Sequence, residues 1–330
     1  MTVLVEVTRG GAVESRHVGA AVVVDTDGRV VFGAGDFEAA IYPRSAIKAL
    51  LALPLVETGV ADRLGLTSAE LALACSSHSG EVAHTETAAS MLAKAGRDVA
   101  TLECGAHWPS RDVAARALAA SGAEPTALHN NCSGKHSGFV CLACGLGQEP
   151  KGYIQPNHPT MRMVTAALAE TTGATLDERN RATDGCSIPT YAIPLRALAL
   201  AFARLGTGVG MSADRAAAAV RLRAAVAEHP FMVAGTGRFD TRLMTALGAR
   251  VFSKTGAEGV YCVAVPELGV GVAVKCDDGA GRASEVVTAN VLNRLLKPDN
   301  PAFESLLKPE LINWNGIKVG ELRATEALAG

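Results

Sequence analysis

Strand patterns at both ends of the chain, separated by a long helical stretch, limit the folds open to it. Near the N-terminus, two apolar runs flank the turn signal Asp25-Thr26-Asp27-Gly28 and predict a β-hairpin. Strand segments from opposite ends of a chain bury their apolar faces when they pair in one sheet. We therefore expect an antiparallel sheet built from both ends. The predicted strands are 3–8, 19–24, 29–32, 250–254, 260–265 and 269–275.

The middle of the chain is predicted to be helical. Ala and Leu recur there at helical spacing, and Gly, Pro and Asn clusters separate the segments. Thr67 to Glu70 has the sequence of a capping box. We expect a single α+β domain, with a sheet from about 1–44 and 249–297 and a helical lobe at about 45–248. The predicted helices are 45–58, 68–75, 82–95, 110–120, 134–145, 159–172, 194–204, 212–228 and 281–296.

Composition favours a packed domain and excludes several classes of protein. Of 330 residues, 48% are hydrophobic and 19% charged, which excludes intrinsic disorder. A formal charge of -2 removes the electrostatic case for a nucleic-acid or anionic-membrane partner. Apolar runs fall short of the roughly 18 residues of a membrane span, and residues 1–6 lack a secretory signal pattern. We expect a cytoplasmic protein with a small-molecule substrate, in which eight cysteines are too sparse for a disulfide scaffold.

Ser45 and Lys48 form a Ser-x-x-Lys motif where strand patterns give way to the first predicted helix. Residues at i and i+3 share one helix face, so the Lys48 amine is expected to reach the Ser45 hydroxyl. The first turn of a helix also lies at the positive end of its dipole, which favours a developing alkoxide. The motif alone is a weak signal, because an N-terminal serine followed by a solvated lysine has the same pattern.

Two further segments strengthen this interpretation. Lys254-Thr255-Gly256 ends a predicted strand, and Ser77 lies in a polar loop between two helices. Serine β-lactamases and penicillin-binding enzymes combine Ser-x-x-Lys, Ser-Asp-Asn and Lys-Thr-Gly in this order, and only the middle element fails to match here. Two lysines in one pocket lower each other's pKa, so one can act as a base while the other stays charged. We therefore expect a serine acyl-transfer site in which Ser77 relays a proton.

Cys132 and Cys186 lie in polar, glycine-containing segments suited to loops. Together with His136 or Lys135 they could form a metal site with an open position. Their spacing matches no common zinc pattern, so unreactive thiols remain the alternative. Further along, Arg238 follows a glycine-rich segment and is suited to pair with a substrate carboxylate, although an ordinary connector has the same sequence.

Several ordered segments, taken together, resemble the rhizobial-type, thermolabile L-asparaginase family. The resemblance runs from about residue 9 to about residue 276. It implies a fold related to glutaminases and serine β-lactamases, usually a homodimer, that hydrolyses L-asparagine to L-aspartate and ammonia. The matching segments are Arg44-Ser45-Ala46-Ile47-Lys48, Cys75-Ser76-Ser77-His78-Ser79-Gly80-Glu81, Asn131-Cys132-Ser133-Gly134-Lys135-His136, Thr183-Asp184-Gly185-Cys186, His229-Pro230 with Val233-Ala234-Gly235, and Lys254.

The resemblance also implies roles for single residues. Two Ser-Lys pairs are expected at one active site, with the first serine as the preferred nucleophile, and a zinc ion is expected beside them. Neutral lysine is an unusual zinc ligand, and spacing alone would not have selected it. The implied residues are Ser45 with Lys48 and Ser77 with Lys254 for catalysis, Cys132, Lys135 and Cys186 for zinc, and Arg44, His136 and Asp184 for substrate.

Two other functions stay open at this point. A β-lactam- or peptide-active serine hydrolase would share the Ser-x-x-Lys and Lys-Thr-Gly elements. Against this alternative, we find neither the Ser-x-Asn element nor an export signal in the sequence. A non-catalytic protein that binds zinc or a small ligand would be expected to lack one catalytic serine or lysine, and none is missing.

Overall fold

The computed structural model describes residues 1–328 and divides into two compact units. Unit 1 contains Met1–Ala46, Ile193–Gly206 and the chain from Arg242 onward. Unit 2 contains Ile47–Ala192 and Thr207–Thr241. The predicted sheet and helical lobe correspond broadly to these units. The segment Ile193–Gly206 differs, because we expected it in the helical lobe and it belongs to the unit that holds the sheet.

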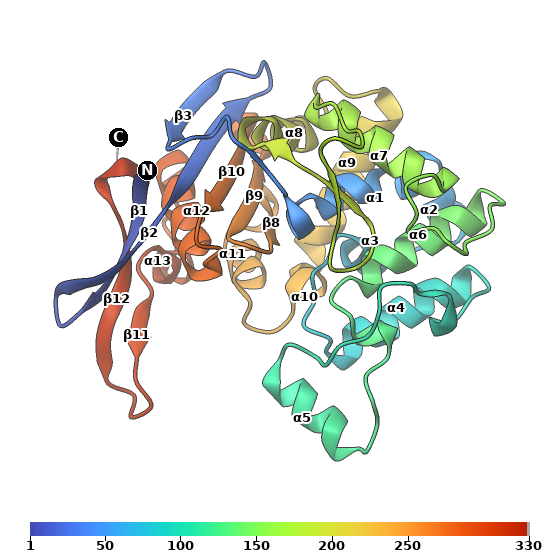
Figure 1. Ribbon diagram of the computed structural model, residues 1–330, viewed down its shortest axis with the longest axis horizontal. Helices are drawn as coiled ribbons and strands as arrows, with labels where there is room; N and C mark the ends of the chain where they lie inside the picture. The colour runs from blue at the N-terminus through green and yellow to red at the C-terminus, as the bar shows by residue number, and fades with distance from the viewer. Residues whose placement is uncertain (329–330) are drawn as a thin grey trace. The chain divides into compact units, whose positions relative to one another are not determined.

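The sheet of unit 1 is antiparallel and joins strands from both ends of the chain, as predicted (Figure 1). Strand β2 pairs with β10 from Gly19 opposite Cys276 to Asp25 opposite Val270. The strand order is β11-β12-β1-β2-β10-β9-β8, and β3 also pairs with β2. The strands are β1 (Thr2–Arg9), β2 (Ala12–Asp25), β3 (Val30–Ala34), β8 (Phe252–Gly256), β9 (Val260–Val265), β10 (Val270–Cys276), β11 (Glu310–Ile312) and β12 (Lys318–Ala324).

The predicted hairpin forms because Asp25 closes its turn. The Asp25 carboxylate accepts hydrogen bonds from the backbone N–H groups of Asp27 and Arg29, at 3.0 and 2.8 Å. The Asp25 carbonyl accepts another from Gly28, whose φ of +82° suits glycine. These bonds set the register of β2 against β3.

Helices pack on the central strands of the sheet. Every residue of β9 is buried, as expected for a strand covered on both faces. Helix α12 (Gly281–Leu296) packs against β9 and β10. Helix α8 (Leu195–Thr207) lies so close to β10 that a Cβ on Gly271 would be 1.9 Å from the Ala199 carbonyl oxygen. Glycine at position 271 therefore permits this close approach.

The tail after Pro298 forms structure that the sequence did not predict. Helix α13 (Pro301–Leu307) packs on α12, and the β11–β12 hairpin extends the sheet next to β1. The pairing is long range, since Val5 lies opposite Ala324. Strands as short as β11 have little signal in the local sequence, and this hairpin joins the sheet only because β1 offers a free edge for pairing.

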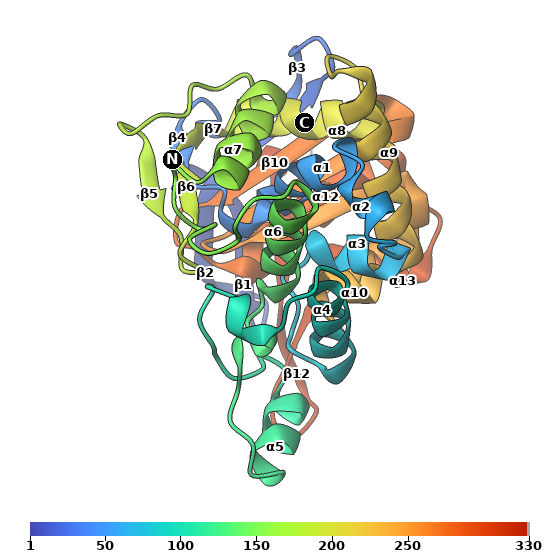
Figure 2. The same ribbon diagram turned by 90° about the vertical axis from the view of Figure 1, so that its right-hand side faces the viewer.

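Unit 2 is built from helices packed around α6 (Ser133–Gly145), which contacts α1, α3 and α4 (Figure 2). All residues from Ser133 to Ala143 are buried, although the first turns carry polar side chains. A buried helix with polar first turns indicates a functional site. The other helices are α1 (Lys48–Glu57), α2 (Val60–Arg63), α3 (Ser68–Ala74), α4 (Val82–Lys94), α5 (Asp112–Ala120), α7 (Pro159–Thr172), α9 (Ala213–Glu228) and α10 (Pro230–Ala234), and α11 (Phe239–Leu247) crosses the unit boundary.

Local signals inside unit 2 are confirmed. Thr67 caps α3 with the predicted capping box, in which the Glu70 carboxylate accepts a hydrogen bond from the Thr67 N–H at 2.7 Å. A two-stranded ribbon, β5 (Arg181–Thr183) and β6 (Pro189–Tyr191), carries the loop that contains Asp184 and Cys186. A second short pair, β4 (Ala40–Ile41) with β7 (Ile193–Pro194), belongs to unit 1.

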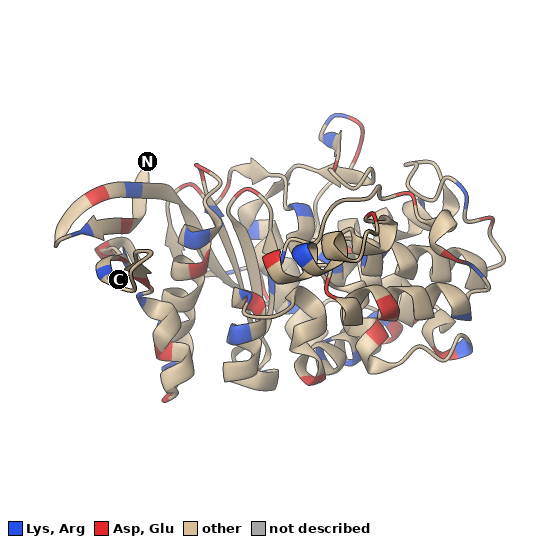
Figure 3. Cartoon of the chain, turned by 90° about the horizontal axis from the view of Figure 1, so that it is seen from below, with Lys and Arg blue, Asp and Glu red and all other residues tan. Residues whose placement is uncertain are grey.

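Acidic and basic residues are interspersed along the chain, in keeping with the formal charge of -2 (Figure 3). Among the helices of residues 1–328, none is both long and apolar enough to cross a membrane.

The close approach of α8 to β10 generates a stability prediction. Replacing Gly271 with Ala would force the helix away from the strand, because the new Cβ has no room beside backbone atoms of Ala199 and Ala203. We expect the free energy of unfolding in urea to fall by about 2 kcal/mol, as for other overpacked interiors. Gly281→Ala is the control, since its Cβ would meet nothing within 4 Å. Equal stability of the two variants would contradict the packing argument.

Candidate active site

Lys48 is the first residue of α1, and its side chain is buried in unit 2. Its Nζ lies 2.9 Å from Ser77 Oγ, 2.5 Å from the Ser76 carbonyl oxygen and 3.3 Å from the Asn131 carbonyl oxygen. Burial lowers the pKa of the Lys48 amine, and the neighbouring Cys132 thiol opposes this shift.

The partners of Lys48 suit it to proton transfer. Carbonyl oxygens only accept hydrogen bonds, so Ser76 and Asn131 take two hydrogens of the amine. The Ser77 hydroxyl can either accept from a charged amine or donate to a neutral one. The amine therefore keeps these partners in both protonation states, and only the direction of its bond with Ser77 reverses.

The loop that carries Ser77 is tied to its neighbours on both sides. The Ser77 N–H donates to the Val233 carbonyl at 2.8 Å. The next residue, His78, accepts from the Gly80 N–H at Nδ1, so its proton lies on Nε2, which contacts Ser133 Oγ at 2.8 Å. Because Ser133 begins α6, this bond links the serine loop to the polar end of the central helix.

Glu81 is the second anchor of this loop. Its carboxylate accepts hydrogen bonds from Ser79 Oγ, from the backbone N–H and Oγ1 of Thr236, and from the Arg111 guanidinium. A Cβ on Gly235 would lie 2.0 Å from Ser79 Oγ, so only glycine lets these segments meet. Burial by itself would raise the pKa of Glu81, but the bonds from Thr236, Ser79 and Arg111 lower it to about 2.

Cys132, Lys135 and Cys186 come together in unit 2, although Cys186 is distant in sequence. Lys135 Nζ lies 2.9 Å from Cys186 Sγ, which also contacts Asp184 Oδ2 at 3.3 Å. A hydrogen bond with Cys186 lowers the pKa of the Cys132 thiol well below its usual value, and the charge of Lys135 lowers it further. Burial opposes a charge on Lys135, but the two thiols outweigh it and raise its pKa.

This cluster has the donor chemistry of a zinc site. Zn²⁺ takes thiolate sulfur readily, whereas a lysine amine is an unusual ligand that has to be neutral to bind, and three protein ligands leave a fourth position open. Within residues 1–328, no group of three or more His, Cys, Asp and Glu side chains could hold a metal ion. The family resemblance implies Lys135 as the third protein ligand beside Cys132 and Cys186, and this ligand set stays a prediction.

His136 follows Lys135 on α6 and is completely buried. Its Nδ1 lies 2.6 Å from the Tyr153 hydroxyl, whereas its Nε2 has no hydrogen-bond partner among the described residues. Burial lowers the pKa of His136, and the charges of Lys135 and Lys48 lower it further.

Three of the expected site residues belong to unit 1. Ser45 is half-buried in a 3₁₀ turn, Arg44–Ile47, that leads directly into α1. Arg44 begins the turn with φ of +52°, a strained backbone conformation for a non-glycine residue. Lys254 lies on β8, is fully buried, and donates to the Thr255 carbonyl at 2.7 Å. The predicted pairings of Ser45 with Lys48 and Ser77 with Lys254 stay predictions.

Asp184 and Arg238, both in unit 2, are half-buried loop residues. Asp184 contacts the Cys186 thiol, so it lies beside the cluster of Cys132, Lys135 and Cys186. The backbone N–H of Arg238 donates to the Gly235 carbonyl at 3.4 Å, directly after the loop that binds Glu81. Their expected contacts with substrate stay predictions.

Sequence reasoning missed Tyr153 and the Asn131 carbonyl as members of this site. Tyr153 follows a glycine in a loop, with no motif around it. A backbone carbonyl has no sequence signature, because every residue carries one. Glu81 was visible only as the end of a matching segment.

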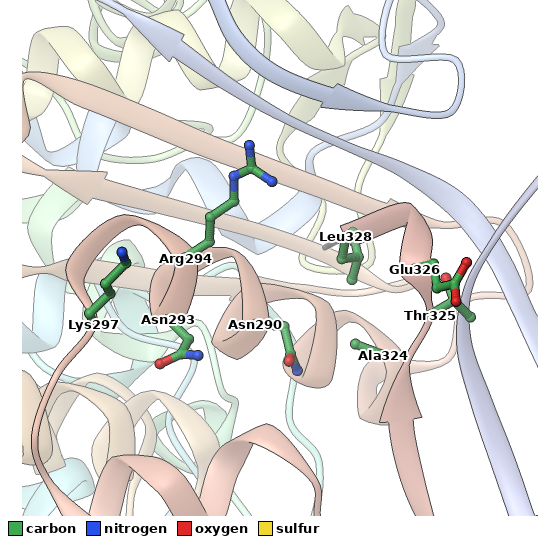
Figure 4. Close-up of a pocket in the computed structure, with 8 residues that line it drawn as sticks. All are labelled: Asn290, Asn293, Arg294, Lys297, Ala324, Thr325, Glu326 and Leu328. Carbon is green, nitrogen blue, oxygen red and sulfur yellow. The ribbon is translucent and has the colours of Figure 1, made fainter. Parts of the chain in front are cut away.

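A separate pocket of about 630 Å³ lies in unit 1, between α12 and the segment 324–328. Figure 4 shows that the Arg294 and Asn290 side chains point in different directions. Arg294 lies 4.9 Å from the centre of the Phe32 ring, and Asn290 donates to the carbonyls of Val286 and Leu307. Polar groups that are directed elsewhere do not converge on a ligand, so we assign no chemistry to this pocket.

Comparison with known proteins identifies the family. The sequence model described as L-asparaginase II matches residues 5–324, nearly the whole chain. The chain belongs to the L-asparaginase II family. Membership implies an asparagine amidohydrolase, in agreement with the resemblance that the motifs indicated.

Two other comparisons add less. No curated protein matches the chain. Among solved structures, a β-lactamase of Mycobacterium bovis aligns with 81% of this chain and 89% of its own, at 14% sequence identity and a TM-score of 0.40.

The bonds to Glu81 generate a pH-dependent stability prediction. Its pKa of about 2 in the folded chain lies below the unfolded value near 4.5, so the stabilisation is complete above pH 4.5 and is lost as pH falls toward 2. We expect Glu81→Gln to lower the free energy of unfolding by about 3 kcal/mol at pH 6. Urea unfolding of both proteins should show that difference shrinking by about 2 kcal/mol at pH 3.

Glu86→Gln is the matched control for this prediction. Glu86 is exposed on α4, the helix that Glu81 precedes, and its replacement should give only a small difference in stability. A Glu81→Gln effect that is constant from pH 6 to pH 3 would contradict the role of the charged carboxylate.

Proposed function

We propose that this protein hydrolyses L-asparagine to L-aspartate and ammonia through a serine-bound acyl-enzyme. Family membership supports the substrate class. The observation that carries the mechanism is the buried Lys48 amine, hydrogen-bonded to Ser77 Oγ at 2.9 Å beside the cluster of Cys132, Lys135 and Cys186. A lysine of lowered pKa in contact with a hydroxyl can accept a proton and return it, which attack by a serine nucleophile requires.

In the proposed reaction, Ser45 Oγ attacks the side-chain amide carbon of asparagine and its proton passes to neutral Lys48. Ser45 precedes Lys48 by three residues, in the 3₁₀ turn that leads into α1, and such spacing places both side chains on one face. When the C–N bond breaks, Lys48 returns the proton to the leaving ammonia through the Ser77 hydroxyl. Water then hydrolyses the ester, with Lys48 as the base. Lys254 is proposed as the lysine that stays charged while Lys48 acts as the base.

We also propose a zinc ion held by Cys132, Lys135 and Cys186. Zinc bound there would supply positive charge that polarises or orients an oxygen of the substrate. Side chains of the protein would bind the substrate itself. Asp184, beside the two thiols, would bind the substrate ammonium. His136, Arg44 and Arg238 would bind its oxygens. The homodimer and the cytoplasmic location implied earlier stay predictions.

The nucleophile assignment predicts a specific pattern of activity. We expect Ser45→Ala and Lys48→Ala each to lower kcat for asparagine by several orders of magnitude, and the double variant to lose little more, because residues of one nucleophilic unit act non-additively. Ammonia release measures the rate, and circular dichroism checks folding. Ser137→Ala, a buried serine on α6, is the control and should keep its activity.

Several results would contradict this proposal. Near-normal activity of Ser45→Ala would exclude Ser45 and transfer the nucleophile role to Ser77. Hydrolysis of a β-lactam but not of asparagine or glutamine would favour the alternative serine hydrolase. Failure to hydrolyse any of a panel of amides and β-lactams would favour a binding protein.

The zinc proposal predicts one zinc ion per chain. Metal analysis of the purified protein should show this content, and Cys132→Ser and Cys186→Ser should each lose most of it, because a zinc site with two protein ligands is weak. Cys141→Ala is the control, since this thiol is buried on α6 and contacts the Met91 carbonyl. Full zinc occupancy in both serine variants would refute the site.

A further inference from the structure

The Tyr153 side chain is completely buried and carries one hydroxyl between two polar neighbours. Its Oη lies 2.9 Å from the backbone nitrogen of Glu103 and 2.6 Å from His136 Nδ1. The Glu103 side chain fixes the same loop, because its Oε1 accepts from the Gly152 N–H at 2.7 Å. Glu103 therefore makes two hydrogen bonds, one to the Tyr153 hydroxyl and one to the backbone of the preceding residue, and together they hold the tyrosine in place.

These contacts determine where the proton of each group lies. A backbone N–H can only donate, so the Tyr153 oxygen accepts from Glu103. If His136 Nδ1 also donated to this oxygen, the buried tyrosine proton would lose its acceptor. The satisfied arrangement has Tyr153 donating to His136 Nδ1. Burial also raises the pKa of Tyr153, which keeps its hydroxyl protonated.

A neutral imidazole that accepts at Nδ1 carries its hydrogen on Nε2. In His136 this nitrogen is buried and has no partner among the described residues. The His136 ring packs against Tyr153 and Phe139, with ring centroids 5.4 and 5.9 Å away. A buried N–H without an acceptor in the protein can donate to a ligand.

We infer that Tyr153 is a positioning residue that fixes His136 in the Nε2–H tautomer, so that this N–H donates to an acceptor oxygen of the bound amide substrate. The inference rests on the proposed function for its substrate, but the tautomer itself belongs to the substrate-free protein. Without the tyrosine hydroxyl, either ring nitrogen can carry the proton. In one of the two tautomers, the nitrogen that faces the substrate oxygen then has no hydrogen to donate.

The first experiment reads the tautomer directly. Nitrogen-15 NMR of protein labelled at histidine distinguishes protonated from unprotonated ring nitrogens, and loss of a signal in His136→Gln assigns the ring. We expect Nδ1 unprotonated and Nε2 protonated in the wild type, and averaged shifts in Tyr153→Phe. Tyr191→Phe, which removes another buried tyrosine hydroxyl of unit 2, should leave the His136 signals unchanged.

The second experiment separates positioning from a general loss of structure. We expect Tyr153→Phe to raise KM for asparagine about tenfold while kcat changes less than about threefold, because the lost contact serves ground state and transition state alike. In His136→Gln, an amide nitrogen reaches about as far as imidazole Nε2 and has no tautomers. Adding Tyr153→Phe to that variant should therefore not raise KM further.

The outcomes separate failure of this inference from failure of the proposed function. A wild-type His136 with its proton on Nδ1, or a tautomer unchanged in Tyr153→Phe, would overturn the inference whether or not asparagine is hydrolysed. A KM that rises equally in the wild-type and His136→Gln backgrounds would also overturn it, since the tyrosine would then act without the histidine. If asparagine is not a substrate, the proposed function fails and the tautomer experiment alone decides the role of Tyr153.

Discussion

A lysine amine removed from water has to find hydrogen-bond partners inside the protein, and unit 2 is organised around this requirement. Lys48 receives carbonyl oxygens from Ser76 and Asn131 and a hydroxyl from Ser77, so three loop positions must be held in place. Hydrogen bonds through His78 and Glu81 hold the serine loop against α6 and the 233–236 loop. The cost of a buried, unpartnered amine thus explains why distant segments converge here.

Helix α6 combines two roles that usually belong to different elements. Along most of its length it is an apolar core helix, and small residues such as Gly134 allow α3 to approach closely. Its first turns carry two buried polar side chains, Lys135 and His136. The Lys135 amine is hydrogen-bonded to the Cys186 thiol, and the His136 ring is hydrogen-bonded to the Tyr153 hydroxyl. Because both side chains leave a rigid, buried helix, their positions depend on packing rather than on a mobile loop.

Much of the architecture could be predicted because its signals are local. The Asp25 turn, the Thr67 capping box and the strand patterns of β9 and β10 each lie within a few residues, and all were confirmed. The β11–β12 hairpin was missed, since its pairing with β1 depends on an edge at the other end of the chain. Helix α8 was expected in the helical lobe and belongs to the unit that holds the sheet, because amphipathic spacing does not say which surface a helix covers.

For the site, the sequence by itself determined the chemical groups: the Ser-x-x-Lys motif, the polar loops with Cys132 and Cys186, and the family to which they belong. Only the tertiary structure decided which groups meet. It paired Lys48 with Ser77, brought Cys186 to Lys135, and placed Tyr153 against His136. The physical reason is that the type of each residue fixes its chemical group, whereas hydrogen bonds between buried groups depend on how segments far apart in sequence pack together.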